Sequence, residues 1–84
     1  MDVLEVQGRD VIEQIINKQD VKRLYEAYER NLKETEKTVI RMRYGLFGAK
    51  EYSQREVAQA LGISRSYVSR IEKKAVEKLR TNFE

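Results

Sequence analysis

The sequence contains no cysteine, no histidine and no proline, and only four glycines. Without cysteine and histidine the chain can form no disulfide, no thiolate or imidazole metal site, and no Cys–His or Ser–His catalytic pair. We also find no phosphate-binding loop and no carboxylate constellation, so we expect neither an enzyme nor a bound cofactor. The absence of proline and the scarcity of glycine favour long helices joined at glycines over a sheet-rich fold.

Long hydrophobic runs are missing as well. No apolar run approaches the roughly 20 residues that a membrane-spanning helix needs, and the first residues lack a signal-peptide pattern. The lack of cysteine is compatible with a reducing compartment. We therefore expect a soluble, cytoplasmic protein with no membrane partner.

The charged residues are present in abundance and are unevenly distributed. The chain of 84 residues is 37% charged and 40% hydrophobic, which suits one small, strongly helical domain. Residues 1–32 have a balance of −2, whereas residues 33–84 have a balance of +5. A basic C-terminal half suggests a polyanionic partner for that half, although ordinary surface charge gives the same count.

The spacing of apolar residues predicts an all-α fold of four to five short helices. These helices are expected at about 10–17, 20–31, 34–44, 54–61 and 65–80. Gly45 is placed to end the third helix, and Gly62 to end the fourth. Ser53 and Glu56 form a capping box at the start of the fourth helix, and Ser64 is a good N-cap for the last.

Residues 53–72, SQREVAQALGISRSYVSRIE, have the features of a helix-turn-helix. Two helices that cross through a short turn need a small residue on the first helix, which Ala58 provides. The turn needs a residue that tolerates positive φ, which Gly62 provides. A helical hairpin that serves packing alone is the alternative reading of this segment.

The second helix of this motif would place its N-terminal half in the major groove of DNA. Its buried stripe is predicted to contain Val68, Ile71, Ala75 and Leu79. The residues left on its outer face are Arg65, Ser66, Ser69, Arg70, Lys73 and Lys74. Arginine can bond guanine O6 and N7 together, whereas lysines further along the helix should meet phosphates.

Two stretches of the chain, ETEKTVIRMRYGL and YSQREVAQALGISRSYVSRIEKKAVEKLR, resemble region 4 of bacterial sigma factors. The Arg43–Leu46 stretch before the motif and the Ile71–Ala75 stretch within it are features of that family. The segment GISRSYVSRIEK is similar above all to the late sporulation factors of the sigma-K type. The resemblance covers residues 20–84, and residues 1–19 correspond to the linker and leading helix before region 4.

The resemblance implies a non-enzymatic function in transcription initiation, with two partners. The first is double-stranded promoter DNA, whose −35 element region 4 binds in a sequence-specific manner. Base contacts are implied for Arg65, Ser66, Ser69 and Arg70. Backbone contacts are implied for Arg43, Ser53, Gln54, Arg55, Lys73 and Lys74. Housekeeping factors carry longer polar or charged residues at the positions of Ser66 and Ser69, so a housekeeping −35 sequence is not expected here.

The second implied partner is the RNA polymerase core, whose β-subunit flap-tip helix docks on the helices within residues 20–46. Residues that could line that cleft, or else belong to the core, are Leu24, Tyr28, Val39, Ile40, Leu46 and Phe47.

Other assignments remain compatible with the sequence. A free region-4-like module bound by an anti-sigma factor, or one contacted by an activator, would use the same surfaces. A stand-alone helix-turn-helix regulator would need a dimer seam, and no convincing seam is visible. A whole sigma factor needs more than 84 residues, so the chain is either an excised domain or a protein reduced to region 4.

Overall fold

The computed structural model describes residues 10–16 and 21–81, and these residues form helices joined by short connections. Residues 10–16 are helical. They are followed by α2 (Val21–Asn31), α3 (Glu34–Tyr44), the short 3₁₀ helix η1 (Leu46–Gly48), α4 (Gln54–Leu61) and α5 (Arg65–Thr81). No residue in these two ranges is in a strand. The predicted all-α fold is confirmed, and each helix lies within one residue of its predicted position wherever its ends are described.

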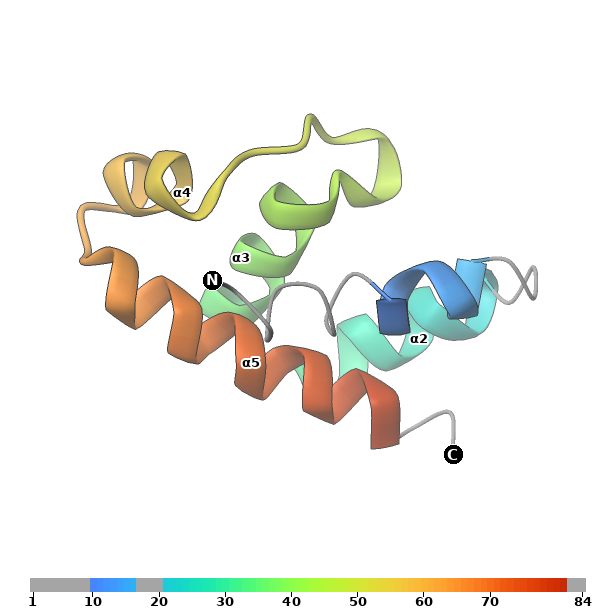
Figure 1. The fold of residues 1–84 in the computed structure, drawn as a ribbon. Helices are drawn as coiled ribbons and strands as arrows, with labels where there is room; N and C mark the ends of the chain where they lie inside the picture. Colours follow the sequence, from blue (N-terminus) through green and yellow to red (C-terminus); the bar gives the residue numbers. More distant parts are fainter. Residues whose placement is uncertain (1–9, 17–20, 82–84) are drawn as a thin grey trace.

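The longest helix, α5, runs through the domain and packs against the other long helices (Figure 1). It contacts α3, α4 and α2, so every other long helix packs against it. The N-terminal end of α5 lies near α4, and its C-terminal end lies toward α2 (Figure 1). One helix therefore passes from the helix-turn-helix into the N-terminal half of the molecule.

The hydrophobic core has two parts, and α5 contributes to both. The larger part joins residues 10–16, α2, α3 and the C-terminal half of α5. Its buried members are Ile12, Ile15, Leu24, Ala27, Tyr28, Leu32, Ile40, Leu46, Ala75, Val76 and Leu79. The smaller part lies under the helix-turn-helix and contains Val39, Val57, Ala58, Val68 and Ile71. The predicted stripe of α5 is thus buried along its whole length.

Local sequence signals explain where the helices begin and end. Gly45 follows α3 with φ 61°, and its amide bonds to the carbonyl of Arg41. The Ser53 hydroxyl accepts from the Glu56 amide at 3.1 Å, and the Glu56 carboxylate accepts from the Ser53 amide at 2.9 Å. These bonds satisfy amides that an α-helix leaves without internal partners. The predicted capping box and the glycine after α3 are therefore confirmed.

Candidate nucleic-acid interface

The turn between α4 and α5 has the geometry of a helix-turn-helix corner. Gly62 lies in the left-handed region with φ 69°, and its amide bonds to the Ala58 carbonyl. The Ile63 amide bonds to the same carbonyl at 3.1 Å. The Ser64 hydroxyl then accepts from the Tyr67 amide at 3.1 Å and starts α5. A bulkier residue with a strong preference for negative φ would strain this corner.

The outward face of α5 carries the side chains expected to face DNA. Arg65, Ser66 and Arg70 are exposed, and Ser69 is half-buried. Lys73 and Lys74 are exposed one turn further along the same helix. The four residues predicted to contact bases thus share the N-terminal half of α5 and are accessible there.

The N-terminus of α4 offers a second place where a phosphate can be held. Helix geometry leaves the amides of Gln54 and Arg55 without a carbonyl partner inside α4, and such amides attract anions. Arg55 is exposed beside them. The Ser53 side chain is exposed, but its hydroxyl oxygen caps the helix.

Two residues expected to contact the DNA backbone have buried side chains, so a side-chain contact from either is wrong in this arrangement. Arg43 is only 2% exposed and Gln54 only 5%. The Arg43 Nε donates to Glu72 Oε1 at 2.9 Å, and its Nη1 donates to the Tyr52 carbonyl at 2.8 Å. Because these side chains are engaged inside the protein, neither side chain can reach a phosphate in this arrangement, and Gln54 could contact one only through its backbone amide.

Glu72 is the centre of this buried polar cluster. Its side chain is 1% exposed and lies on α5 between Arg70 and Lys73. Oε1 accepts from Arg43 Nε and also from Gln54 Nε2 at 3.0 Å. Oε2 accepts from the Tyr44 hydroxyl. One carboxylate therefore joins the end of α3, the start of α4 and the middle of α5.

This cluster was not predicted from the sequence, although the sequence carries a signal for it. Glu72 lies four residues after Val68 and three before Ala75, which places it in the buried stripe of α5. Arg43 lies three residues after Ile40 and four after Val39, on the apolar side of α3. Opposite charges on two buried stripes indicate a buried ion pair, because isolated buried charges are very costly.

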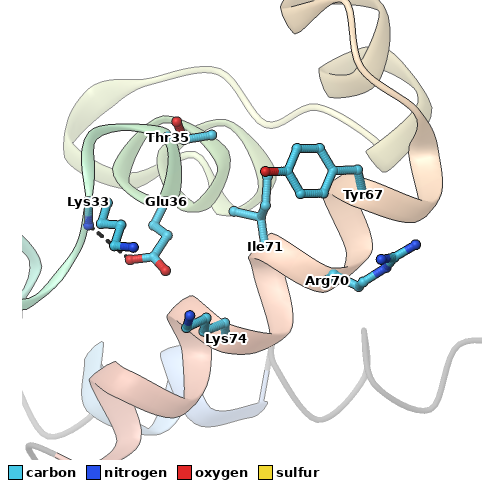
Figure 2. Close-up of a pocket in the computed structure, with 7 residues that line it drawn as sticks. All are labelled: Lys33, Thr35, Glu36, Tyr67, Arg70, Ile71 and Lys74. Atoms are coloured by element: carbon cyan, nitrogen blue, oxygen red, sulfur yellow. Dashed lines mark hydrogen bonds between the residues drawn. The ribbon is translucent and has the colours of Figure 1, made fainter.

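A shallow hollow of about 240 Å³ lies between the start of α3 and α5 (Figure 2). Arg70 and Lys74 line it from α5, and Lys33 and Glu36 line it from the start of α3. The Glu36 carboxylate accepts from the Lys33 amide at 2.9 Å and from the Lys78 ammonium at 2.9 Å. Burial raises the pKa of the Glu36 carboxyl, but these two hydrogen bonds and the charges of Lys78 and Lys74 outweigh it, so the pKa is lowered.

Five of the six residues considered for the polymerase cleft belong to the core instead. Leu24, Tyr28, Val39, Ile40 and Leu46 are at most 5% exposed. Phe47 differs, because it is 42% exposed and has a left-handed backbone with φ 57°.

An aromatic surface surrounds Phe47. Its ring meets the Tyr25 ring edge-on at 5.3 Å and the Tyr28 ring at 5.0 Å. Tyr25 is 50% exposed, and Val21, one turn earlier on α2, is 47% exposed. We call Val21, Tyr25 and Phe47 the aromatic patch.

Within the described ranges, no helix is long and apolar enough to cross a membrane. The same residues contain no group of three or more acidic side chains that could hold a metal ion.

Comparison with known proteins identifies the family. The model of sigma-70, region 4 matches residues 30–81. The chain belongs to the sigma-70 region 4 family. The resemblance proposed from the sequence is thereby confirmed, and so is the expectation that the chain is not an enzyme, since this is a family of DNA-binding transcription initiation factors.

Three curated relatives show where in this family the chain lies. It is 49% identical over 79 residues to an RNA polymerase sigma-28 factor of Bacillus thuringiensis subsp. kurstaki, a match that covers 94% of this chain and 33% of the relative. It is 47% identical over 79 residues to the sigma-K factor of Bacillus subtilis, covering 94% of this chain and 26% of the relative. A sigma-E factor of Clostridium acetobutylicum is 49% identical over 51 residues, which cover 61% of this chain and 22% of that protein. The chain thus spans a third or less of the length of these relatives, and no solved structure gave a significant match.

Proposed function

We propose that this region 4 domain binds the promoter −35 element by placing α5 in the major groove. The observation that carries the proposal is the exposed basic face of α5 within a helix-turn-helix of the sigma-70 region 4 family. The similarity to sigma-K and sigma-E factors supports a place for this protein among sporulation sigma factors. Such a protein acts with RNA polymerase in the cytoplasm.

In this proposal, different parts of α5 contact the bases and the phosphates. Arg65, Ser66, Ser69 and Arg70 lie in the half that enters the groove first, so they face base edges. Lys73 and Lys74 lie further along and meet phosphates, together with Arg55 and the free amides at the start of α4. Ser66 and Ser69 are short, so the two arginines carry most of the base discrimination in this proposal.

The test compares Arg70→Ala with Lys73→Ala, since both remove an exposed cation from the same helix. A preferred site is first selected with the parent chain from duplexes randomised over a short block, and its single-base variants are then prepared. Arg70→Ala should lose about 1–3 kcal/mol of preference at one base pair, as expected for a bidentate arginine–guanine contact. Lys73→Ala should weaken all duplexes by a similar factor and reduce the salt dependence by roughly one charge.

The same set of duplexes also shows whether the proposed DNA contacts are wrong. If Arg70→Ala weakens every duplex equally, Arg70 contacts the backbone. If neither variant affects DNA binding, α5 is not the reading helix, and a module that binds only proteins becomes the better assignment.

We further propose that the aromatic patch docks the flap-tip helix of the polymerase β-subunit. Two observations favour this patch over the rest of the N-terminal half. Val21, Tyr25 and Phe47 are large side chains left 42–50% exposed; the rings of Tyr25 and Phe47 contact each other, and Val21 lies one turn before Tyr25 on α2. An aromatic residue seldom adopts positive φ, and strained residues of this kind often occur at binding sites.

A further inference from the structure

We infer that the buried hydrogen bond between Gln54 and Glu72 positions the proposed base-contacting face of α5 relative to the proposed phosphate-binding end of α4, and so sets the base preference of the domain. That face of α5 carries Arg65, Ser66, Ser69 and Arg70. The inference rests on the proposed −35 binding and deepens it. Neither side chain touches DNA in this scheme, so both are positioning residues.

The location of the bond is the first support for this role. Gln54 is the first residue of α4, directly beside the amides proposed to hold a phosphate. Glu72 lies two residues after Arg70 and one before Lys73, between the proposed base and phosphate contacts of α5. The 3.0 Å bond between their side chains therefore joins the two parts that would grip the same duplex.

The second support is the chemistry of the contact between α4 and α5. Their apolar contact, made by Val57, Ala58, Val68 and Ile71, is not directional and tolerates small sliding movements. A hydrogen bond requires a defined distance and angle, so it restricts sliding and rotation of one helix on the other. Recognition depends on such restriction, because contacts need to be held within about 0.5 Å of their productive geometry.

The third support is that the bond is anchored at both of its ends. Arg43 binds the same Glu72 oxygen at 2.9 Å and so fixes the carboxylate to α3. It also binds the Tyr52 carbonyl, which lies just before the N-cap of α4. Both sides of the Gln54–Glu72 bond are therefore tied to α3, which makes the bond a rigid link.

The experiment compares Gln54→Leu with Tyr44→Phe in the 84-residue chain. Each change removes one neutral donor to Glu72 and retains the Arg43–Glu72 ion pair, but only Gln54→Leu cuts the link between α4 and α5. The readout is the ratio of affinities for the selected duplex and its single-base variants. Thermal melting confirms that both variants are folded, and Gln54→Asn, with its shorter side chain, replaces Gln54→Leu if the latter is not.

We expect Gln54→Leu to lower the affinity ratio at its most discriminating base pair by about fivefold or more, the low end of a specific base contact. Tyr44→Phe should keep that ratio within about twofold of the parent. A Gln54 variant that keeps the parental ratios, or weakens all duplexes equally, overturns the inference. A Tyr44→Phe variant that loses preference to the same extent overturns it too, because the cluster would then act only through stability. A parent chain with no base preference rejects the proposed function itself.

Discussion

At the scale of single residues, the Arg43–Glu72 pair is the most consequential interaction. Both side chains are at most 2% exposed, so both charges have been removed from water. Their attraction offsets a large desolvation cost, and Gln54 and Tyr44 donate two further hydrogen bonds to Glu72. The pair is therefore far more sensitive to losing one partner than to losing both.

This asymmetry predicts the behaviour of three variants. Arg43→Met leaves Glu72 charged and unpaired in the core, and we expect it to lower the free energy of unfolding by about 3 kcal/mol or more. The double variant Arg43→Met/Glu72→Met removes both charges and should recover most of that loss. Arg55→Met is the control, because it removes an exposed arginine and should change stability by less than about 0.5 kcal/mol.

Urea unfolding followed by circular dichroism measures these differences. If the double variant is no more stable than Arg43→Met alone, removing the second charge recovers nothing and the energetic account of the cluster is wrong.

At the scale of helices, the ends of α3 and α4 could be predicted because they depend on local chemistry. The capping box of Ser53 and Glu56 and the glycines at 45 and 62 act within a few residues of their own position. The stripes of α3 and α5 carried a signal for the burial of Arg43 and Glu72, but the burial of Gln54 could not be predicted, since it depends on a partner far away in the sequence. Gln54 has the position of an exposed first-turn residue, yet it meets Glu72 eighteen residues later.

The residues of the candidate site fall into the same two groups, those that local sequence predicts and those that depend on distant partners. The exposure of Arg65, Ser66, Arg70 and Lys73 followed from subtracting the buried stripe of a single helix. The aromatic patch did not follow from periodicity. Phe47 lies outside the long helices and becomes exposed through the left-handed turn of η1, which no helical pattern encodes. Leu24 and Ile40 belong to the same apolar pattern, and only packing against α5 decides that they are core.

The two turn glycines permit a matched prediction at this scale. Gly45 and Gly62 have similar positive φ values, 61° and 69°. An added Cβ at Gly62 meets nothing within 4 Å, whereas at Gly45 it would lie 3.0 Å from the Ala49 carbonyl oxygen. Gly62→Ala should therefore cost only the backbone strain, about 1–2 kcal/mol, whereas Gly45→Ala should cost more.

Thermal melting separates these two glycines. A loss of about 1 kcal/mol lowers Tm by roughly 4–8 °C in a domain of this size. Equal losses for the two variants would show that the loop after α3 shifts to accommodate a methyl group. No loss for Gly62→Ala would contradict the left-handed turn between α4 and α5.

At the scale of the whole molecule, the proposed DNA surface and the aromatic patch belong to different parts of the core. The DNA surface rests on the smaller cluster beneath α4 and the start of α5. The patch is built on α2 and η1, beside the larger cluster that includes the C-terminal half of α5. Figure 1 shows α4 and α2 toward opposite ends of α5. The charge distribution agrees with this separation, since the excess of basic residues lies in the C-terminal half.

This separation predicts that the two partners bind at once and independently. Phe47→Ala removes the centre of the aromatic patch, so it should weaken binding of a flap-tip helix peptide by about tenfold or more, as for an aromatic hot spot. It should leave DNA affinity within about twofold of the parent value. Arg70→Ala should weaken DNA binding and leave the affinity for the peptide within about twofold. Saturating duplex should leave the affinity of the parent for the peptide unchanged. Fluorescence anisotropy measures the peptide affinities with a labelled peptide, with and without duplex, and the DNA affinities with a labelled duplex. Chemical-shift mapping locates the peptide. If Phe47→Ala binds the peptide as the parent does, the patch is not the docking site. If duplex and peptide compete, the two surfaces overlap, because separate and rigidly connected sites have no reason to exclude one another.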